Sequence, residues 1–262
     1  MMATIAFIGT GNMGSALARA AAKSPRTDML FLSNRSAEKA RLLAEELGGA
    51  CCSNLEAAER ADVLFMAVKP QMLAGVAAEI RNVLEKRERV LLVSMAAGKD
   101  LKMLHELMGD QPIIRIMPNI PVCTGEGLTL FCAGKDVTEE DKSLLRALLA
   151  PSGLVEELDE KQMDAATGVS GCGPAYAAMF VEALADGAVA CGLPRREALI
   201  YAAQMLRGTA ALLVQSGEHP GALKDRVCSP GGSTIQGVRV LEQRAFRAAV
   251  TDAVIAAFEK KF

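Results

Sequence analysis

The sequence predicts an α/β fold with a doubly wound sheet, followed by an all-α domain, and three observations support this prediction. A glycine-rich turn lies between an apolar, β-branched run at residues 4–8 and a helical pattern that begins at Ser15. Short apolar runs then alternate with helical patterns as far as Leu158, which is typical of parallel strands connected by helices. From Asp159 onward the sequence shows helical patterns only.

The glycine-rich turn has the spacing Gly9-x-Gly11-x-x-Gly14. In this pattern Gly9 permits a tight turn, Gly11 lets a pyrophosphate approach the backbone, and Gly14 lets helix and strand pack closely. The N-terminus of the following helix directs N–H groups and the positive end of its dipole at the phosphates. A Rossmann-type dinucleotide site is therefore predicted, with a glycine-rich turn that binds no ligand as the alternative.

The end of the second strand, at residues 29–32, indicates which dinucleotide is bound. A domain that prefers NAD(H) has Asp or Glu about twenty residues after the glycines, where it accepts hydrogen bonds from the ribose 2′-hydroxyl. This chain has Ser33-Asn34-Arg35 there, two short polar side chains and a guanidinium that suit a 2′-phosphate. NADP(H) is therefore favoured. Alternatively, Arg35 is a solvated charge that opens the next helix.

The loops after two later strands also have features of a ligand site. The strand at residues 62–68 runs into Lys69-Pro70, and Pro70 exposes the loop at the carboxyl end of that strand, where ligands bind in open parallel sheets. The strand at residues 90–94 is followed by Ala96-Ala97-Gly98, whose small size lets a flat ring lie close to the backbone. The other elements expected before Leu158 are helices at 37–47, 55–60, 72–84 and 139–150, strands at 50–52, 113–117 and 154–158, and an edge strand at 126–131.

We expect a domain boundary near Leu158, with a Rossmann-like domain at residues 1–158 and an all-helical substrate and dimerisation domain at residues 159–262. The expected helices of the second domain span 159–169, 175–191, 195–216 and 221–227, with a final helical region that ends at Phe262. Long helices that are apolar around most of their circumference need partners to cover them. The second domain is therefore predicted to pair with another subunit, at least as a C2 dimer.

Composition excludes several classes of function. The 29 basic and 31 acidic side chains give a net charge of −2 without a long single-sign block, so we expect no nucleic-acid partner and no membrane association. The seven cysteines are scattered and form no C-x-x-C, and there are two histidines. These features favour small buried cysteines in a reducing cytoplasm and predict no metal site.

A second mechanistic motif is Ser229-Pro230-Gly231-Gly232-Ser233-Thr234, which precedes the final helical region. Two adjacent glycines before a helix can direct successive N–H groups into one concavity, which suits a carboxylate or a phosphate. A plain interhelical turn explains the same residues equally well.

Together these motifs resemble the pyrroline-5-carboxylate reductase family over nearly the whole chain. The matching segments are 7–14, 67–70, 96–98 and 117–119, and in the helical half Ser170-Gly171-Cys172-Gly173-Pro174-Ala175-Tyr176 and residues 223–225 through 229–234. The resemblance implies NADPH-dependent reduction of 1-pyrroline-5-carboxylate to L-proline, with NADH as a weaker donor. It also implies a homodimer at least, with a decamer built as a pentamer of dimers as a larger state.

The resemblance further implies specific contacts. The implied cofactor contacts are Gly9, Thr10, Gly11, Asn12, Met13, Gly14, Ser33, Asn34, Arg35, Asn54, Val68, Lys69, Pro70, Ala96, Ala97 and Gly98. The implied substrate contacts are Ser229, Gly231, Gly232, Ser233 and Thr234, with the Thr234 hydroxyl as a hydrogen-bond or proton donor near the ring nitrogen. Cys172 stands where the family usually has serine, and Cys228 where serine or threonine is usual, which leaves hydrogen-bonding detail open.

Two other functions compete with the reductase interpretation of the sequence. A β-hydroxyacid dehydrogenase shares the two-domain layout, and the spacing Gly168-x-x-Gly171-x-Gly173 resembles its glycine-rich turn. Its catalytic lysine would fall at Ala177, so the acid–base group for alcohol oxidation is missing. A catalytically silent NADP(H) sensor is the other rival, but a sensor needs no second anion site such as the turn at 229–234.

Overall fold

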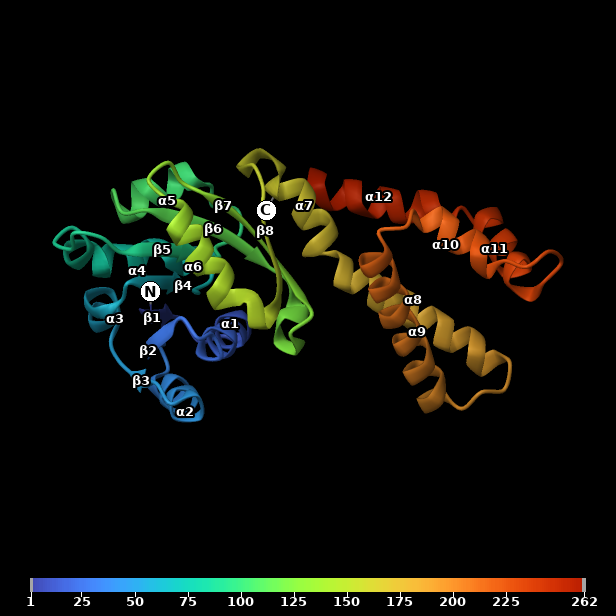
Figure 1. The fold of residues 1–262 in the computed structure, drawn as a ribbon, viewed down its shortest axis with the longest axis horizontal. Helices are drawn as coiled ribbons and strands as arrows, with labels where there is room; N and C mark the ends of the chain where they lie inside the picture. Colours follow the sequence, from blue (N-terminus) through green and yellow to red (C-terminus); the bar gives the residue numbers. More distant parts are fainter. Residues whose placement is uncertain (1, 261–262) are drawn as a thin grey trace. The chain divides into compact units, whose positions relative to one another are not determined.

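The computed structural model describes residues 2–260 and contains two compact units, one that ends at Gly171 and one that spans Cys172–Glu259 (Figure 1). The first unit holds the whole sheet together with helices on both of its faces. The second is entirely helical. The predicted fold class, a Rossmann-type doubly wound sheet followed by an all-α region, is thus confirmed. The division by function at 158/159 stays a prediction.

The sheet has eight strands in the order β3-β2-β1-β4-β5-β6-β7-β8. Along this order, all neighbouring strands from β3 through β2, β1, β4 and β5 to β6 are parallel. Strand β7 is antiparallel to β6, and β8 is parallel to β7. The strands are β1 Ala3–Ile8, β2 Thr27–Ser33, β3 Ala50–Cys51, β4 Val63–Met66, β5 Leu91–Ser94, β6 Ile113–Pro118, β7 Gly127–Ala133 and β8 Gly153–Glu157.

The expectation of an edge strand at residues 126–131 is wrong. Strand β7 lies between β6 and β8, and its register with β8 runs from Gly127 opposite Gly153 to Phe131 opposite Glu157. The true edge is β8, where Leu154 is 57% exposed. The sequence predicts two short strands here but not which strands pair with them. A buried apolar strand has the same sequence pattern whether it has one neighbouring strand or two.

The helices of the first unit pack on both faces of the sheet (Figure 1). They are α1 Asn12–Ala22, α2 Ala37–Leu47, α3 Asn54–Arg60, α4 Pro70–Leu84, α5 Leu101–Met108, α6 Glu139–Leu149 and α7 Met163–Ser170, with 3-10 turns at Ile120–Thr124, Ala150–Ser152 and Glu160–Gln162. No helix is predicted from the sequence at α5. Its start is fixed by Asp100, whose carboxylate accepts from the Met103 N–H at 2.7 Å.

Each central strand contributes to two apolar cores because successive side chains point to opposite faces. In β1, Ile5 and Phe7 belong to the core that includes α1, α2 and α6. Ala6 and Ile8 belong to the core beneath α3, α4 and α5. Burial on both faces, as the apolar run at 4–8 predicts, therefore follows from helices on both sides of the sheet.

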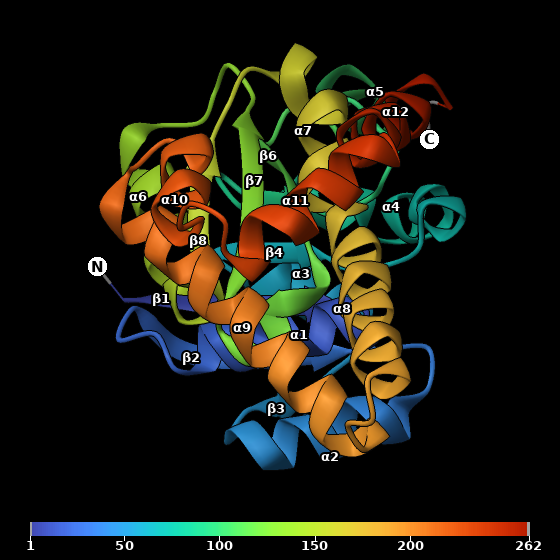
Figure 2. The same cartoon turned by 90° about the vertical axis from the view of Figure 1, so that its right-hand side faces the viewer.

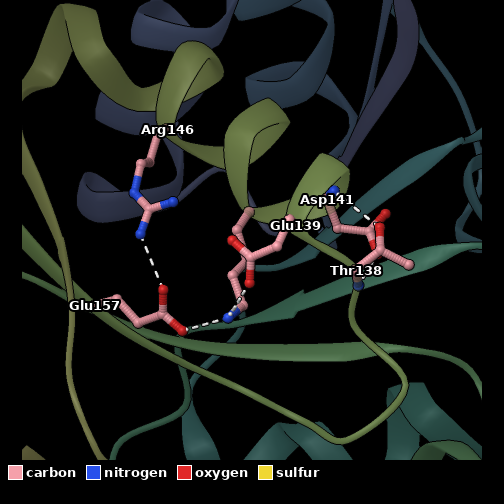
Figure 3. A network of polar contacts seen from close by, with 6 residues as sticks. Thr138, Glu139, Asp141, Arg146 and Glu157 are labelled. Atoms are coloured by element: carbon pink, nitrogen blue, oxygen red, sulfur yellow. Dashed lines mark hydrogen bonds and ion pairs between the residues drawn. The ribbon is translucent and has the colours of Figure 1, made fainter.

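Polar contacts attach α6 to the edge strand β8 (Figure 3). Thr138 and Asp141 form a reciprocal capping box at the start of α6. Glu157 on β8 accepts from Arg146 at 2.9 Å and pairs with Lys142 at 2.6 Å. Burial opposes the ionisation of Glu157, but the two cations outweigh it and lower its pKa.

The second unit consists of α8 Gly173–Ala190, α9 Arg195–Ser216, α10 Pro220–Val227, α11 Ser233–Gln243 and α12 Phe246–Glu259. Helices α8 and α9 pack side by side and are joined by the turn at 191–194 (Figures 1 and 2). The predicted final helical region divides at Ala245, which has a φ of 56°, into α11 and α12. Its expected end at Phe262 lies outside the described residues.

Few side chains of these helices are buried over the described part of the chain. The buried ones are Ala185, Ala198, Ala202 and Leu223. By contrast, Met179 is 69% exposed and Val214 is 84% exposed. Apolar surface of this extent on a small helical unit is typical of a protein–protein interface.

Candidate dinucleotide-binding site

The predicted cofactor residues of the first unit, apart from Asn54 at the start of α3, follow four neighbouring strands, β2, β1, β4 and β5, at their carboxyl ends. Because these strands are parallel and adjacent, the four loops lie along one edge of the sheet. Residues 9–14 follow β1, 33–35 complete and follow β2, 68–70 follow β4, and 96–98 follow β5. The topology therefore gathers segments that are far apart in the sequence.

The turn after β1 has the geometry that its three glycines predict. Gly9 has a φ of +104°, and a Cβ on it would lie 2.4 Å from the Ala67 carbonyl oxygen. A Cβ on Gly14 would lie 2.2 Å from the Gly9 carbonyl oxygen. A Cβ on Gly11 would meet no described atom within 4 Å. Gly9 and Gly14 thus serve the fold, whereas Gly11 borders open space at the N-terminus of α1.

Thr10 and Asn34 shape the same turn. The Thr10 N–H donates to Asn34 Oδ1 at 3.4 Å, and Asn34 Nδ2 donates to the Ser36 carbonyl at 3.3 Å. Asn34 is therefore largely engaged in holding the turn. The Thr10 hydroxyl is buried and has no hydrogen-bond partner among residues 2–260. An orphaned hydroxyl beside a helix N-terminus suits an anionic ligand such as a pyrophosphate.

A pocket of about 480 Å³ lies beyond the end of β2. Its lining is formed by Ser33, Asn34, Arg35, Ala37, Cys51, Cys52, Ser53, Asn54 and Glu56. Arg35 is exposed and Ser33 is buried. Burial raises the pKa of the Cys52 thiol to about 11, so this cysteine stays protonated near neutral pH.

Two residues that line this pocket, Ser33 and Asn54, belong to a chain of hydrogen bonds across three elements. Ser33 Oγ donates to Asn54 Oδ1 at 2.6 Å, and Asn54 Nδ2 donates to Glu79 Oε2 at 2.8 Å. Sequence reasoning identified Ser33 and Asn54 but missed Glu79 and Glu56. The spacing Ser53-x-x-Glu56 is a capping-box signal that could have placed Glu56 here. No local signal places Glu79 on α4 beside Asn54.

The loop after β4 is shorter than expected, because α4 begins at Pro70 and not at Met72. Pro70 is the first residue of α4, and the exposed Lys69 caps that helix with extended backbone. Gly98 adopts a φ of +71° after the small residues Ala96 and Ala97. Val68 lies close to the glycine turn, since its Cγ1 would be 3.2 Å from a Cβ on Gly9.

The predicted substrate residues form one turn in the second unit. Gly231 has a φ of +70°, and the Gly232 N–H donates to the Ser229 carbonyl at 3.0 Å. Gly232 is the N-cap of α11 and, as a glycine, supplies no capping side chain. Ser233 and Thr234 are exposed in the first turn of the helix. The turn thus presents backbone N–H groups and hydroxyls in the form that an anion requires.

Other polar groups of the second unit serve its packing. The Tyr176 hydroxyl donates to the Ala253 carbonyl at 3.2 Å, which ties α8 to α12. Asp186 pairs with Arg195 at 2.5 Å. Over residues 2–260, no group of three or more His, Cys, Asp or Glu side chains is arranged to hold a metal ion. No helix in that range is both long and apolar enough to cross a membrane.

Comparisons with known proteins place the chain among pyrroline-5-carboxylate reductases. Residues 160–261 match a family model described as pyrroline-5-carboxylate reductase dimerisation, and residues 4–98 match one described as NADP oxidoreductase coenzyme F420-dependent. The chain is 42% identical over 260 residues to a pyrroline-5-carboxylate reductase of Escherichia coli, covering 98% of this chain and 96% of that protein.

Solved structures of similar proteins cover almost the whole chain. A pyrroline carboxylate reductase of Plasmodium falciparum with NADP bound is 34% identical, with a TM-score of 0.86, over 99% of this chain and 98% of that one. A pyrroline-5-carboxylate reductase of Coxiella burnetii is 30% identical, with a TM-score of 0.93, over 99% and 97% of the two chains.

Proposed function

Because the chain belongs to the pyrroline-5-carboxylate reductase family, we propose that it reduces 1-pyrroline-5-carboxylate to L-proline with NADPH as the hydride donor. The observation that best supports this is the geometry of the glycine-rich turn, residues 9–14, at the N-terminus of α1. Its open space at Gly11 and its orphaned Thr10 hydroxyl both fit a dinucleotide pyrophosphate.

The residues at the end of β2 suit the adenosine ribose of NADPH. The Arg35 guanidinium is exposed at the pocket that Ser33 and Asn54 line, where it can pair with a 2′-phosphate. The short loops at 68–70 and 96–98 leave room for the rest of the cofactor along the same sheet edge. NADH lacks the 2′-phosphate and so cannot make the contact with Arg35. It is therefore the weaker hydride donor.

In the second unit, the turn at Ser229, Gly231, Gly232, Ser233 and Thr234 is proposed to hold the substrate carboxylate. Its N–H groups and hydroxyls supply donors at a helix N-terminus. The Thr234 hydroxyl is proposed to lie near the ring nitrogen. Holding the carboxylate in this way fixes the orientation of the ring.

The reaction needs little acid–base help from the chain. When bound, NADPH supplies a hydride to the carbon of the C=N bond. A protonated imine arrives from solution with its proton already on nitrogen, so hydride addition leaves a neutral secondary amine. The chain then needs mainly to align the two reactants and exclude water. The described residues that line the two candidate sites are accordingly poor in catalytic acids and bases.

We further infer an assembly of at least two subunits. The match to a dimerisation family model and the exposed apolar side chains of the second unit support a homodimer. A decamer, as a pentamer of dimers, is the larger state to test. The expectation of buried cysteines is wrong, since only Cys132 is buried. All seven are free thiols, and we propose a reducing, cytoplasmic location.

A spectrophotometric assay tests the proposed activity. Purified protein is mixed with NADPH and pyrroline-5-carboxylate, and in parallel with NADP⁺ and a 3-hydroxyacid, while absorbance of the reduced nicotinamide is followed. We expect substrate-dependent loss of absorbance in the first mixture and no gain in the second. A gain in the second mixture alone would support a hydroxyacid dehydrogenase, and silence in both despite NADPH binding would support a sensor.

A further inference from the structure

Glu79 contacts a predicted cofactor residue without lining the pocket itself. It lies on α4, is exposed, and accepts a hydrogen bond from Asn54 Nδ2 at 2.8 Å. Asn54 is the first residue of α3, and its Oδ1 lies 2.6 Å from the Ser33 Oγ. The three side chains thus form one chain of hydrogen bonds that ends at the pocket beyond β2.

The chemistry of a carboxylate fixes the direction of this chain. An ionised Glu79 can only accept, so the Asn54 carboxamide must turn its NH₂ group toward Glu79 and its oxygen toward Ser33. The carboxamide oxygen can also only accept, so the Ser33 hydroxyl must donate its proton to Asn54. Ser33 then has only lone pairs left to offer to a ligand.

A serine oxygen of this kind discriminates between the two dinucleotides. The ribose 2′-hydroxyl of NADH can donate to it. The 2′-phosphate of NADPH is chiefly an acceptor near neutral pH, and it meets another acceptor at Ser33. The hydrogen-bonded chain therefore opposes the preference for NADPH that the Arg35 guanidinium creates.

We propose that Glu79 is a positioning residue that moderates cofactor selectivity through Asn54 and Ser33, so that the chain retains use of NADH. This rests on the proposed placement of the adenosine ribose in the pocket beyond β2. Glu79 acts by fixing the Asn54 carboxamide and touches neither reactant.

The substitution Glu79→Gln tests this mechanism because glutamine has the same shape but can also donate. The NH₂ group that it introduces can donate to Asn54 Oδ1, so the Asn54 carboxamide can reverse and its own NH₂ group can donate to Ser33. The Ser33 proton is then free to bind the 2′-phosphate. We expect the ratio of the NAD⁺ to NADP⁺ dissociation constants to rise about tenfold, as for one gained hydrogen bond to a charged group.

The assay is calorimetric titration of each variant with NADP⁺ and NAD⁺, so it requires no turnover. The ratio of the two constants within one preparation is insensitive to loss of folded protein. In steady-state kinetics the KM for NADPH should fall while kcat stays unchanged. Glu85→Gln is the matched control, because Glu85 carries the same charge at the end of the same helix and pairs with Arg81 instead. It should leave the ratio unchanged.

A double-mutant cycle separates positioning from simple charge removal. In an Asn54→Ala background, Glu79→Gln should change the ratio less than about twofold, because the intermediary is gone. An unchanged ratio in Glu79→Gln alone, or an equal change in both backgrounds, would overturn the proposal. If the unmodified protein binds neither dinucleotide, the proposed function itself fails, and the inference fails with it.

Discussion

The glycine turn allows a sharp prediction, because two of its glycines differ in what surrounds them. A methyl group added at Gly14 would lie 2.2 Å from the Gly9 carbonyl oxygen and 2.9 Å from the Ala67 Cβ. Both distances are far below van der Waals contact, so backbone must move. Such overpacking costs about 1–3 kcal/mol, which exceeds the roughly 1 kcal/mol that alanine gains over glycine within a helix. We expect Gly14→Ala to lower the free energy of unfolding.

A methyl group at Gly11 meets no described atom within 4 Å. Gly11 is the N-cap of α1, where alanine is less favourable than glycine by about 1 kcal/mol at most. The added methyl would instead intrude on the space proposed for the pyrophosphate. At about 1–3 kcal/mol for the clash, NADP⁺ should bind roughly 5- to 150-fold more weakly.

Urea unfolding and calorimetric titration with NADP⁺ measure the two effects on the same preparations. Gly11→Ala should retain stability and lose affinity, and Gly14→Ala should lose stability first. If Gly11→Ala binds NADP⁺ as tightly as the unmodified chain, the pyrophosphate does not lie at this turn.

Three further predictions follow from individual side chains. Thr234→Ala should lower kcat roughly tenfold, the order for one lost hydrogen bond to a charged group, and a total loss with intact cofactor binding would make Thr234 an obligatory proton donor. Glu157→Gln should lower stability at neutral pH by about 0.5–1 kcal/mol. Because the pKa of Glu157 is lowered in the folded chain, its contribution is full above the unfolded pKa. Thermal melts should therefore show the difference from the unmodified protein shrink once the pH drops below the unfolded pKa of about 4.3 and vanish as it falls through the lower folded pKa; a constant difference would argue against ion pairing. Asn119 donates to the Ser170 carbonyl at 3.1 Å and accepts from the Leu128 N–H at 2.8 Å. Asn119→Ala should cost about 1–3 kcal/mol in urea unfolding, whereas Asn119→Asp, which keeps the acceptor, should cost less.

Local sequence features predicted most of the fold because each has a local physical cause. The strand at 4–8 and the turn at Gly9 are determined by apolar burial and by a backbone angle that favours glycine. The start of α6 follows from the capping pair Thr138 and Asp141. No helix is predicted at α5, because its apolar pattern covers only the eight residues Leu101–Met108.

Features that depend on distant segments could not be predicted. The inner position of β7 depends on its pairing with β8, more than twenty residues further along the chain. The contact between Glu79 and Asn54 depends on how α3 packs against α4. Neither the strand pairing nor the side-chain contact can be predicted from the spacing of residues within one segment. The glycines at 9–14 follow from backbone shape, whereas the supporting side chains Glu56 and Glu79 were missed.

Isotope transfer is the most direct test of the proposal that NADPH gives its hydride to the C=N carbon of pyrroline-5-carboxylate. The protein is incubated with pyrroline-5-carboxylate and NADPH deuterated at the transferring position of the nicotinamide, and the product is analysed by NMR. We expect L-proline with a single deuterium on the ring carbon that is bonded to nitrogen and does not bear the carboxylate. Unlabelled proline, or oxidation of NADPH without proline, would contradict it.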